Sequence, residues 1–63
     1  MTQKELAYFE DAIGHESNII KILQNLVNGI GDNKIVDFIK DETNKHSIRR
    51  EKLLNFLKEQ ANE

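Results

Sequence analysis

The chain has 63 residues, of which 38% are hydrophobic and 32% charged, and it contains neither cysteine nor proline. This composition excludes disulfide frameworks and thiolate metal sites, and the net charge of −2 argues against a general binder of nucleic acid or anionic membranes. No apolar run approaches the roughly 18 residues of a membrane span and no secretory signal is visible, so we expect a cytoplasmic protein. So short a chain forms a single domain, 1–63, and its small core calls for support by oligomerisation.

Two helices are predicted, separated by one turn. Thr2 and Glu5 have the Thr-x-x-Glu spacing of a capping box, just ahead of an apolar series. The later segment Asn-Gly-Ile-Gly-Asp-Asn interrupts that series. Its glycines can take the left-handed conformation that ends a helix, and its Asp or Asn can accept the free N–H groups that start the next. The pattern predicts a helix over about 3–28, a tight turn over about 29–32 and a helix over about 33–60.

Apolar residues in both helices recur at alternating steps of three and four, the heptad spacing of helices that pack along a seam. The seam of the first helix comprises Leu6, Phe9, Ile13, Glu16, Ile20, Leu23, Val27 and Ile30. The seam predicted for the second helix comprises Ile35, Ile39, Glu42, His46, Arg49, Leu53, Phe56 and Gln60. Further apolar residues flank both seams, and the short turn makes the helices antiparallel neighbours.

A lone pair of helices cannot cover apolar stripes of this width, and it would leave an apolar face in water. Two copies packed face to face would close the core. The predicted fold is therefore all-α: an antiparallel two-helix hairpin that forms a homodimer, a four-helix bundle. The chain itself is the expected partner, with no nucleic acid and no membrane, and the alternative is a long monomeric hairpin.

The middle of the two seams is polar, with Glu16 in the first helix and Glu42, His46 and Arg49 in the second. Reflection about the turn places Glu16 at the height of His46, since each lies fifteen residues from Gly31. Burying these groups without partners would cost several kcal/mol. They must therefore pair with one another, reach water or hold a ligand.

This polar layer has three interpretations. We favour a structural layer of ion pairs that includes Arg49 and specifies register more than it adds stability. The alternative is a metal site of Glu16, Glu42 and His46, because two copies would supply four carboxylates and two imidazoles, a set that suits iron or manganese. The third is a pH-dependent assembly that responds to the charge of His46.

No catalytic function is predicted, because the chain lacks a phosphate-binding glycine loop, a nucleophile elbow and a His-Glu-x-x-His motif. The basic cluster of Lys45, Arg49, Arg50 and Lys52 is interleaved with acidic residues and has no aromatic platform. We interpret it as a solvated helix face. The expected function is that of a structural or interaction protein without catalytic residues or cofactor.

Several segments resemble the small spore-coat-F-like proteins of spore-forming bacteria. They are the opening Thr-Gln-Lys-Glu-Leu, the Glu-Asp-Ala-Ile at 10–13 with Glu16, and the late His46 followed by Leu-Leu-Asn-Phe-Leu at 53–57. The resemblance extends over nearly the whole chain. It implies a half-ferritin-like hairpin of the broad ferritin-like group and an association with the spore. It also implies that any metal would be held by Glu16, Glu42 and His46.

Overall fold

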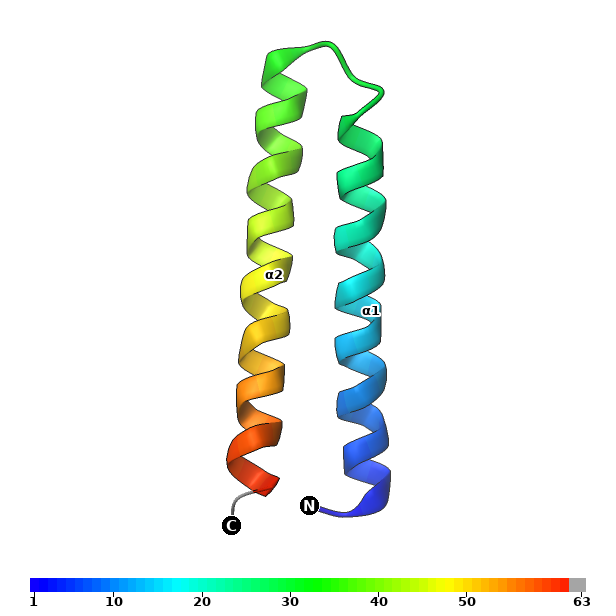
Figure 1. Cartoon of the computed structure of the whole chain (residues 1–63), viewed down its shortest axis with the longest axis vertical. Helices are drawn as coiled ribbons and strands as arrows, with labels where there is room; N and C mark the ends of the chain where they lie inside the picture. The colour runs from blue at the N-terminus through cyan, green and yellow to red at the C-terminus, as the bar shows by residue number, and fades with distance from the viewer. Residues whose placement is uncertain (62–63) are drawn as a thin grey trace.

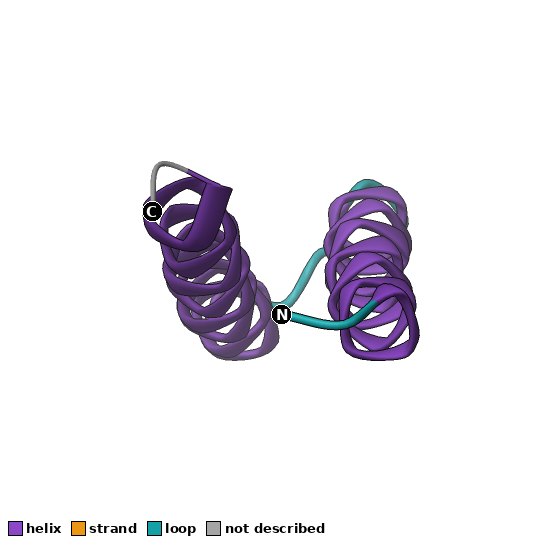
Figure 2. Ribbon diagram, turned by 90° about the horizontal axis from the view of Figure 1, so that it is seen from below, coloured by secondary structure: helices purple, strands orange, loops and turns teal. Residues whose placement is uncertain are grey.

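The computed structural model describes residues 1–61, which form two α-helices, α1 (Gln3–Val27) and α2 (Asn33–Ala61). The helices run antiparallel and side by side, with Met1 and Ala61 at the end opposite the turn (Figure 1). Seen along their length they make a single layer (Figure 2), and the principal extents are 47 × 16 × 10 Å. The predicted two-helix hairpin is confirmed, and each helix ends within one residue of the predicted position.

The predicted capping box at the start of α1 is confirmed. The N–H of Glu5 donates to the Thr2 hydroxyl at 3.1 Å, and the N–H of Thr2 donates to the Glu5 carboxylate at 2.8 Å. The backbone N–H of Thr2, followed by its hydroxyl, lowers the pKa of Glu5 below its ordinary value. A lowered folded-state pKa means that this contribution is present above the ordinary Glu pKa and is lost as the pH falls through the lowered one.

The turn does not use a left-handed glycine, so the prediction of a glycine cap was wrong. No glycine of the described chain has positive φ. Instead α1 tightens into bonds of the i to i+3 type, in which the N–H groups of Asn28, Gly29 and Ile30 donate to carbonyls three residues back. The start of α2 follows expectation, because the Asp32 carboxylate accepts from the N–H of Lys34 at 2.8 Å.

The two helices meet along one stripe each, and the stripe on α1 is the predicted seam from Phe9 to Ile30. On α2 every second member of the seam differs from the prediction. The residues turned toward α1 are Val36, Ile39, Thr43, His46, Arg50, Leu53, Leu57 and Gln60, all of them buried or half-buried. Among the described residues Ile39 alone is buried, with 5% of its surface exposed. The hairpin by itself therefore has almost no core.

Gly14 lies in the middle of α1 on the exposed surface, and a Cβ atom there would meet nothing within 4 Å. We expect Gly14→Ala to raise the free energy of unfolding by about 1 kcal/mol, because glycine is the poorer helix former. Urea denaturation followed by circular dichroism measures the change. A loss of stability would mean that another chain packs closely against this position.

Candidate functional site

The polar layer is built around a contact between the two helices. Glu16 of α1 and His46 of α2 meet with 2.5 Å between Oε2 and Nδ1. Their side chains are 17% and 16% exposed, so the pair is largely screened from water. When Glu16 is ionised, His46 donates through its Nδ1 N–H. That N–H is present both in the neutral ring protonated at Nδ1 and in the imidazolium. The placement of these two residues at one height is thus confirmed.

A second contact between the helices lies beside the first and was not predicted. The Arg50 Nε donates to the Ser17 hydroxyl at 2.7 Å, and both side chains are half-buried. The sequence carried a signal for it, since Val36, Thr43, Arg50 and Leu57 also follow a seven-residue repeat. Together the four polar side chains link α1 to α2 at mid-length and oppose sliding of one helix along the other.

Arg49 and Glu42 do not join this layer. Arg49 is exposed, contrary to prediction, and Arg50 takes the inward place. Glu42 is half-buried at the edge of α2, where its carboxylate contacts the Lys45 ammonium at 3.3 Å. The physical reason is the partners of the residues that turn inward: the Thr43 hydroxyl donates to the Ile39 carbonyl at 2.8 Å, and Arg50 donates to Ser17.

Lys45 contacts two acidic residues of its own helix. Its ammonium lies 3.3 Å from Asp41 as well as from Glu42. The hydrogen bond to Asp41, followed by that to Glu42, raises the pKa of Lys45 above its ordinary value. Asp41 and Lys45 are open to solvent and the Glu42 side chain is 31% exposed, so this cluster contributes little to stability. Its consequence is that Glu42 is engaged by a cation rather than turned toward Glu16 and His46.

Of the predicted metal ligands, one hairpin brings together Glu16 and His46 only. Within residues 1–61, no three His, Cys, Asp or Glu side chains converge as a metal site would require. The predicted site draws on two copies of the chain, so the role of Glu16, Glu42 and His46 as ligands stays a prediction. Within one hairpin, the pair is a polar contact that joins the two helices.

We expect Glu16→Leu to keep the fold and to change the free energy of unfolding by between zero and a gain of about 1 kcal/mol. Leucine would extend the apolar seam between Ile13 and Ile20, and this apolar contact offsets the hydrogen bond that His46 loses, since the His46 side chain keeps some contact with water. Urea denaturation measures the change, with Glu16→Gln as the variant that keeps a hydrogen-bond acceptor. A loss of about 2 kcal/mol or more would show that the carboxylate itself is required.

A second feature is a row of large apolar side chains that neither helix covers. We call it the apolar face, and it comprises Tyr8, Ile19, Ile22 and Leu26 of α1 with Ile35, Phe38 and Phe56 of α2. All but the half-buried Ile19 are strongly exposed, from 43% for Phe56 to 64% for Phe38. On each helix these residues recur at steps that return to the same side. They form two parallel stripes along the hairpin.

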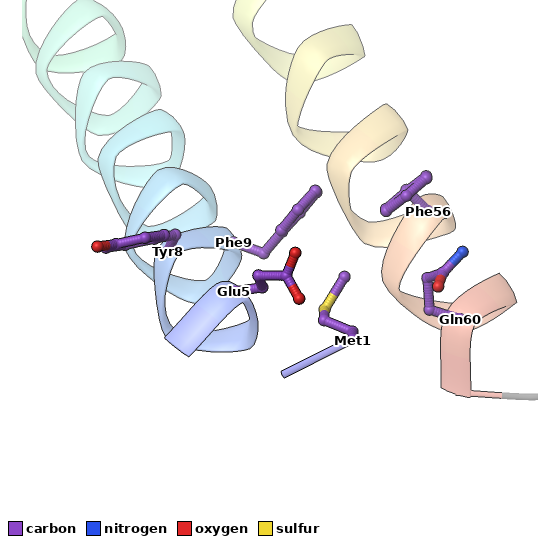
Figure 3. A pocket seen from close by; sticks show the side chains of 6 residues that line it. All are labelled: Met1, Glu5, Tyr8, Phe9, Phe56 and Gln60. Carbon is purple, nitrogen blue, oxygen red and sulfur yellow. The ribbon is translucent and has the colours of Figure 1, made fainter. Parts of the chain in front are cut away.

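Open pockets show that the two stripes lie on the same side of the hairpin. Glu5 and Tyr8 of α1 line one pocket together with Phe56 of α2. Figure 3 shows Phe9 and Phe56 turned toward each other between the helices, while Tyr8 points away from α2. The two phenyl rings are stacked with 5.1 Å between their centroids. This stacked pair thus lies at the end of the apolar face nearest the chain termini.

The opposite side of the hairpin is more polar at mid-length and nearer the turn. The pockets there are lined by Ser17, Ser47, Arg50 and Glu51 at mid-length, and by Gln24, Lys40, Thr43 and Asn44 nearer the turn, among a few apolar residues of the seam. At the end with the chain termini, a pocket on this side is lined by Met1, Leu6 and Leu57 with Gln60 and Ala61. Most of the exposed large apolar side chains of the described residues nevertheless lie on the apolar face.

Comparison with known protein families, with curated proteins and with solved structures found no match to this chain. Over the residues that the structure describes, neither helix contains a stretch long and apolar enough to cross a membrane.

Proposed function

We propose that this protein acts as a homodimeric four-helix bundle of structural or interaction type, with no catalytic activity of its own. The observation that carries the proposal is the apolar face. Six of the nine large apolar side chains that the hairpin exposes lie on it, and Ile39 is the only buried residue among those described. Apolar surface of this extent is unfavourable in water, and covering it is the main source of free energy in association.

The exposed area supports a partner of the same size. The hairpin exposes 4997 Å² of surface, whereas a compact protein of 7.3 kDa is expected to expose about 4,200 Å². The excess of about 800 Å² equals the area that each partner buries in a standard protein interface. A second copy of the chain supplies a matching face by symmetry.

Sedimentation equilibrium at micromolar concentration tests the dimer. We expect a species of twice the 7.3 kDa chain mass, with helical circular dichroism throughout. A helical species that sediments at the mass of one chain would overturn the proposal. The resemblance to spore-coat-F-like proteins supports a place of action in the cytoplasm of a spore-forming cell or in its spore.

A metal-binding function is the second candidate, and the contact between Glu16 and His46 favours it. In a dimer, two such pairs and two copies of Glu42 would offer oxygen and imidazole ligands that suit iron or manganese. Metal analysis of protein purified without chelator, together with thermal melts in added ferrous or manganous ions, tests this candidate. Bound metal must raise the melting temperature, because it binds the folded state. An unchanged melting temperature and no bound metal would exclude the function.

A further inference from the structure

We infer that two copies of the hairpin dock through their apolar faces in antiparallel fashion, with the turns at opposite ends of the bundle. This inference rests on the proposed homodimer and names its interface and geometry. The two-fold axis would cross the hairpin at right angles to the helices, so that α1 lies on α1 of the second copy and α2 lies on α2. The argument rests on where the charged and apolar residues of the face fall along the hairpin.

The contacts between the helices fix the height of each residue. Phe9 stacks on Phe56, and Glu16 meets His46, so residues near 17 in α1 and near 47 in α2 lie at the same height. This height is also the centre of the apolar face, since Tyr8 and Leu26 are each nine residues from 17. Phe38 and Phe56 are each nine residues from 47. An axis at this height superimposes the two ends of the face.

Such an axis pairs the large apolar residues at the two ends of the face. Tyr8 comes to lie opposite Leu26 of the second copy, and Phe38 opposite Phe56. The positions five residues from the centre also match: Ala12 meets Ile22, so that a small residue faces a large one. Large side chains opposite small ones are what close helix packing requires.

The charges of the face agree with the same axis. Glu42 and Lys52 are each five residues from 47, so each carboxylate would meet an ammonium of the other copy. By the helical spacing, the face and its rims carry four acidic and five basic residues, so two copies meet with little net charge: Glu5, Asp41, Glu42, Glu59, Lys4, Lys34, Lys45, Arg49 and Lys52. The unfavourable juxtapositions are Lys45 with Arg49 and Ile35 with Glu59. Asp41 and Glu42 already lie beside Lys45.

The parallel arrangement lacks the charge pairing. With the turns at the same end, α1 would lie on α2 of the second copy at equal height, and the ends of the face would still pair, Tyr8 with Phe56 and Leu26 with Phe38. Along the middle, Ile19 would meet Lys45, Ile22 would meet Glu42, and His15 would face Arg49. Two charged groups would be set against isoleucine side chains, which costs desolvation without a partner. The opposite-charge pairing in the middle of the face therefore favours the antiparallel dimer.

Spin labels on single cysteines distinguish the two geometries, because the chain has no cysteine of its own. Gly31→Cys places a label in the turn, where a Cβ atom meets nothing within 4 Å and φ is not positive. Ile48→Cys places the control label on an exposed site away from the apolar face, close to the central height. Pulsed dipolar spectroscopy then measures the distance between the labels of two copies.

For the turn label we expect about 40 Å, since each turn lies some thirteen residues of helix from the axis at about 1.5 Å per residue. A turn-to-turn distance near 20 Å, about two helix diameters, would overturn the antiparallel geometry and leave the dimer intact. The control label should show coupling in either geometry, at about 10–15 Å where α2 lies on α2 and at about 20–30 Å where the two copies of α2 lie on opposite sides of the bundle. If the control label shows no dipolar coupling at micromolar concentration, the homodimer itself fails, and the inference fails with it.

Discussion

Ile39→Ala is expected to lower the free energy of unfolding by about 2–4 kcal/mol, the cost of deleting a buried branched side chain and leaving a cavity. Ile39 is the one buried residue of the described chain, with 5% of its surface exposed. A domain of this size rarely has more than about 3–5 kcal/mol in total. The variant should therefore be largely unfolded under conditions in which the native protein is folded.

Ile48→Ala is the matched control, because it removes the same atoms from a side chain that is 56% exposed on the same helix. Alanine is the better helix former, so we expect no loss of stability, or a gain of a few tenths of a kcal/mol. Both variants are compared by urea denaturation at one protein concentration, since the stability of a dimer depends on concentration. Equal midpoints for the two variants would contradict the assignment of Ile39 as the centre of the core.

The hairpin was predictable from sequence because its signals are local. The Thr2 and Glu5 spacing specifies the start of α1, and Asp32 specifies the start of α2. The seam of α2 was predictable only in part, because two versions of it share Ile39, His46, Leu53 and Gln60. The positions that differ, 35, 42, 49 and 56 in one version and 36, 43, 50 and 57 in the other, are apolar at both ends and polar in the middle in either version. Apolar periodicity cannot choose between the two versions, and the contacts of the polar residues in the middle do.

The same limit explains the outcome at the polar layer. Glu16 and His46 belong to both versions of the seam, so counting residues from the turn was enough to bring them together. Arg49 and Arg50 belong to different versions, and which of the two turns inward depends on a hydrogen-bond partner in α1. Ser17 offers that partner to Arg50. A side chain whose position depends on a contact across the fold is not specified by its own helix.

The apolar face joins these observations to the proposed function. The displaced seam turns Val36 and Leu57 toward α1, while Ile35 is exposed and Phe56 stacks on Phe9 with 43% of its surface exposed. Each choice of seam residue thus also decides what the hairpin offers to a partner. The hairpin buries few apolar residues in its own core and exposes many on one side, as the proposed association requires.

The apolar face can be tested by a charge at its centre. We expect Ile22→Asp to weaken the dimer by about 100-fold or more, because association would bury an unpaired carboxylate twice, once on each copy. Ile22 lies on the apolar face and is 55% exposed in the hairpin, so the substitution adds no buried charge to the monomer. Sedimentation equilibrium over a range of concentrations measures the dissociation constant.

The chain offers a close control in Ile48→Asp, since Ile48 is the same residue type, is 56% exposed and lies off the apolar face. Its carboxylate stays in water in both monomer and dimer, so we expect a dissociation constant within about threefold of the native one. Both variants carry the same change in net charge and a similar cost in helix propensity. Equal weakening by the two substitutions would mean that a general property of the chain, rather than the apolar face, holds the copies together.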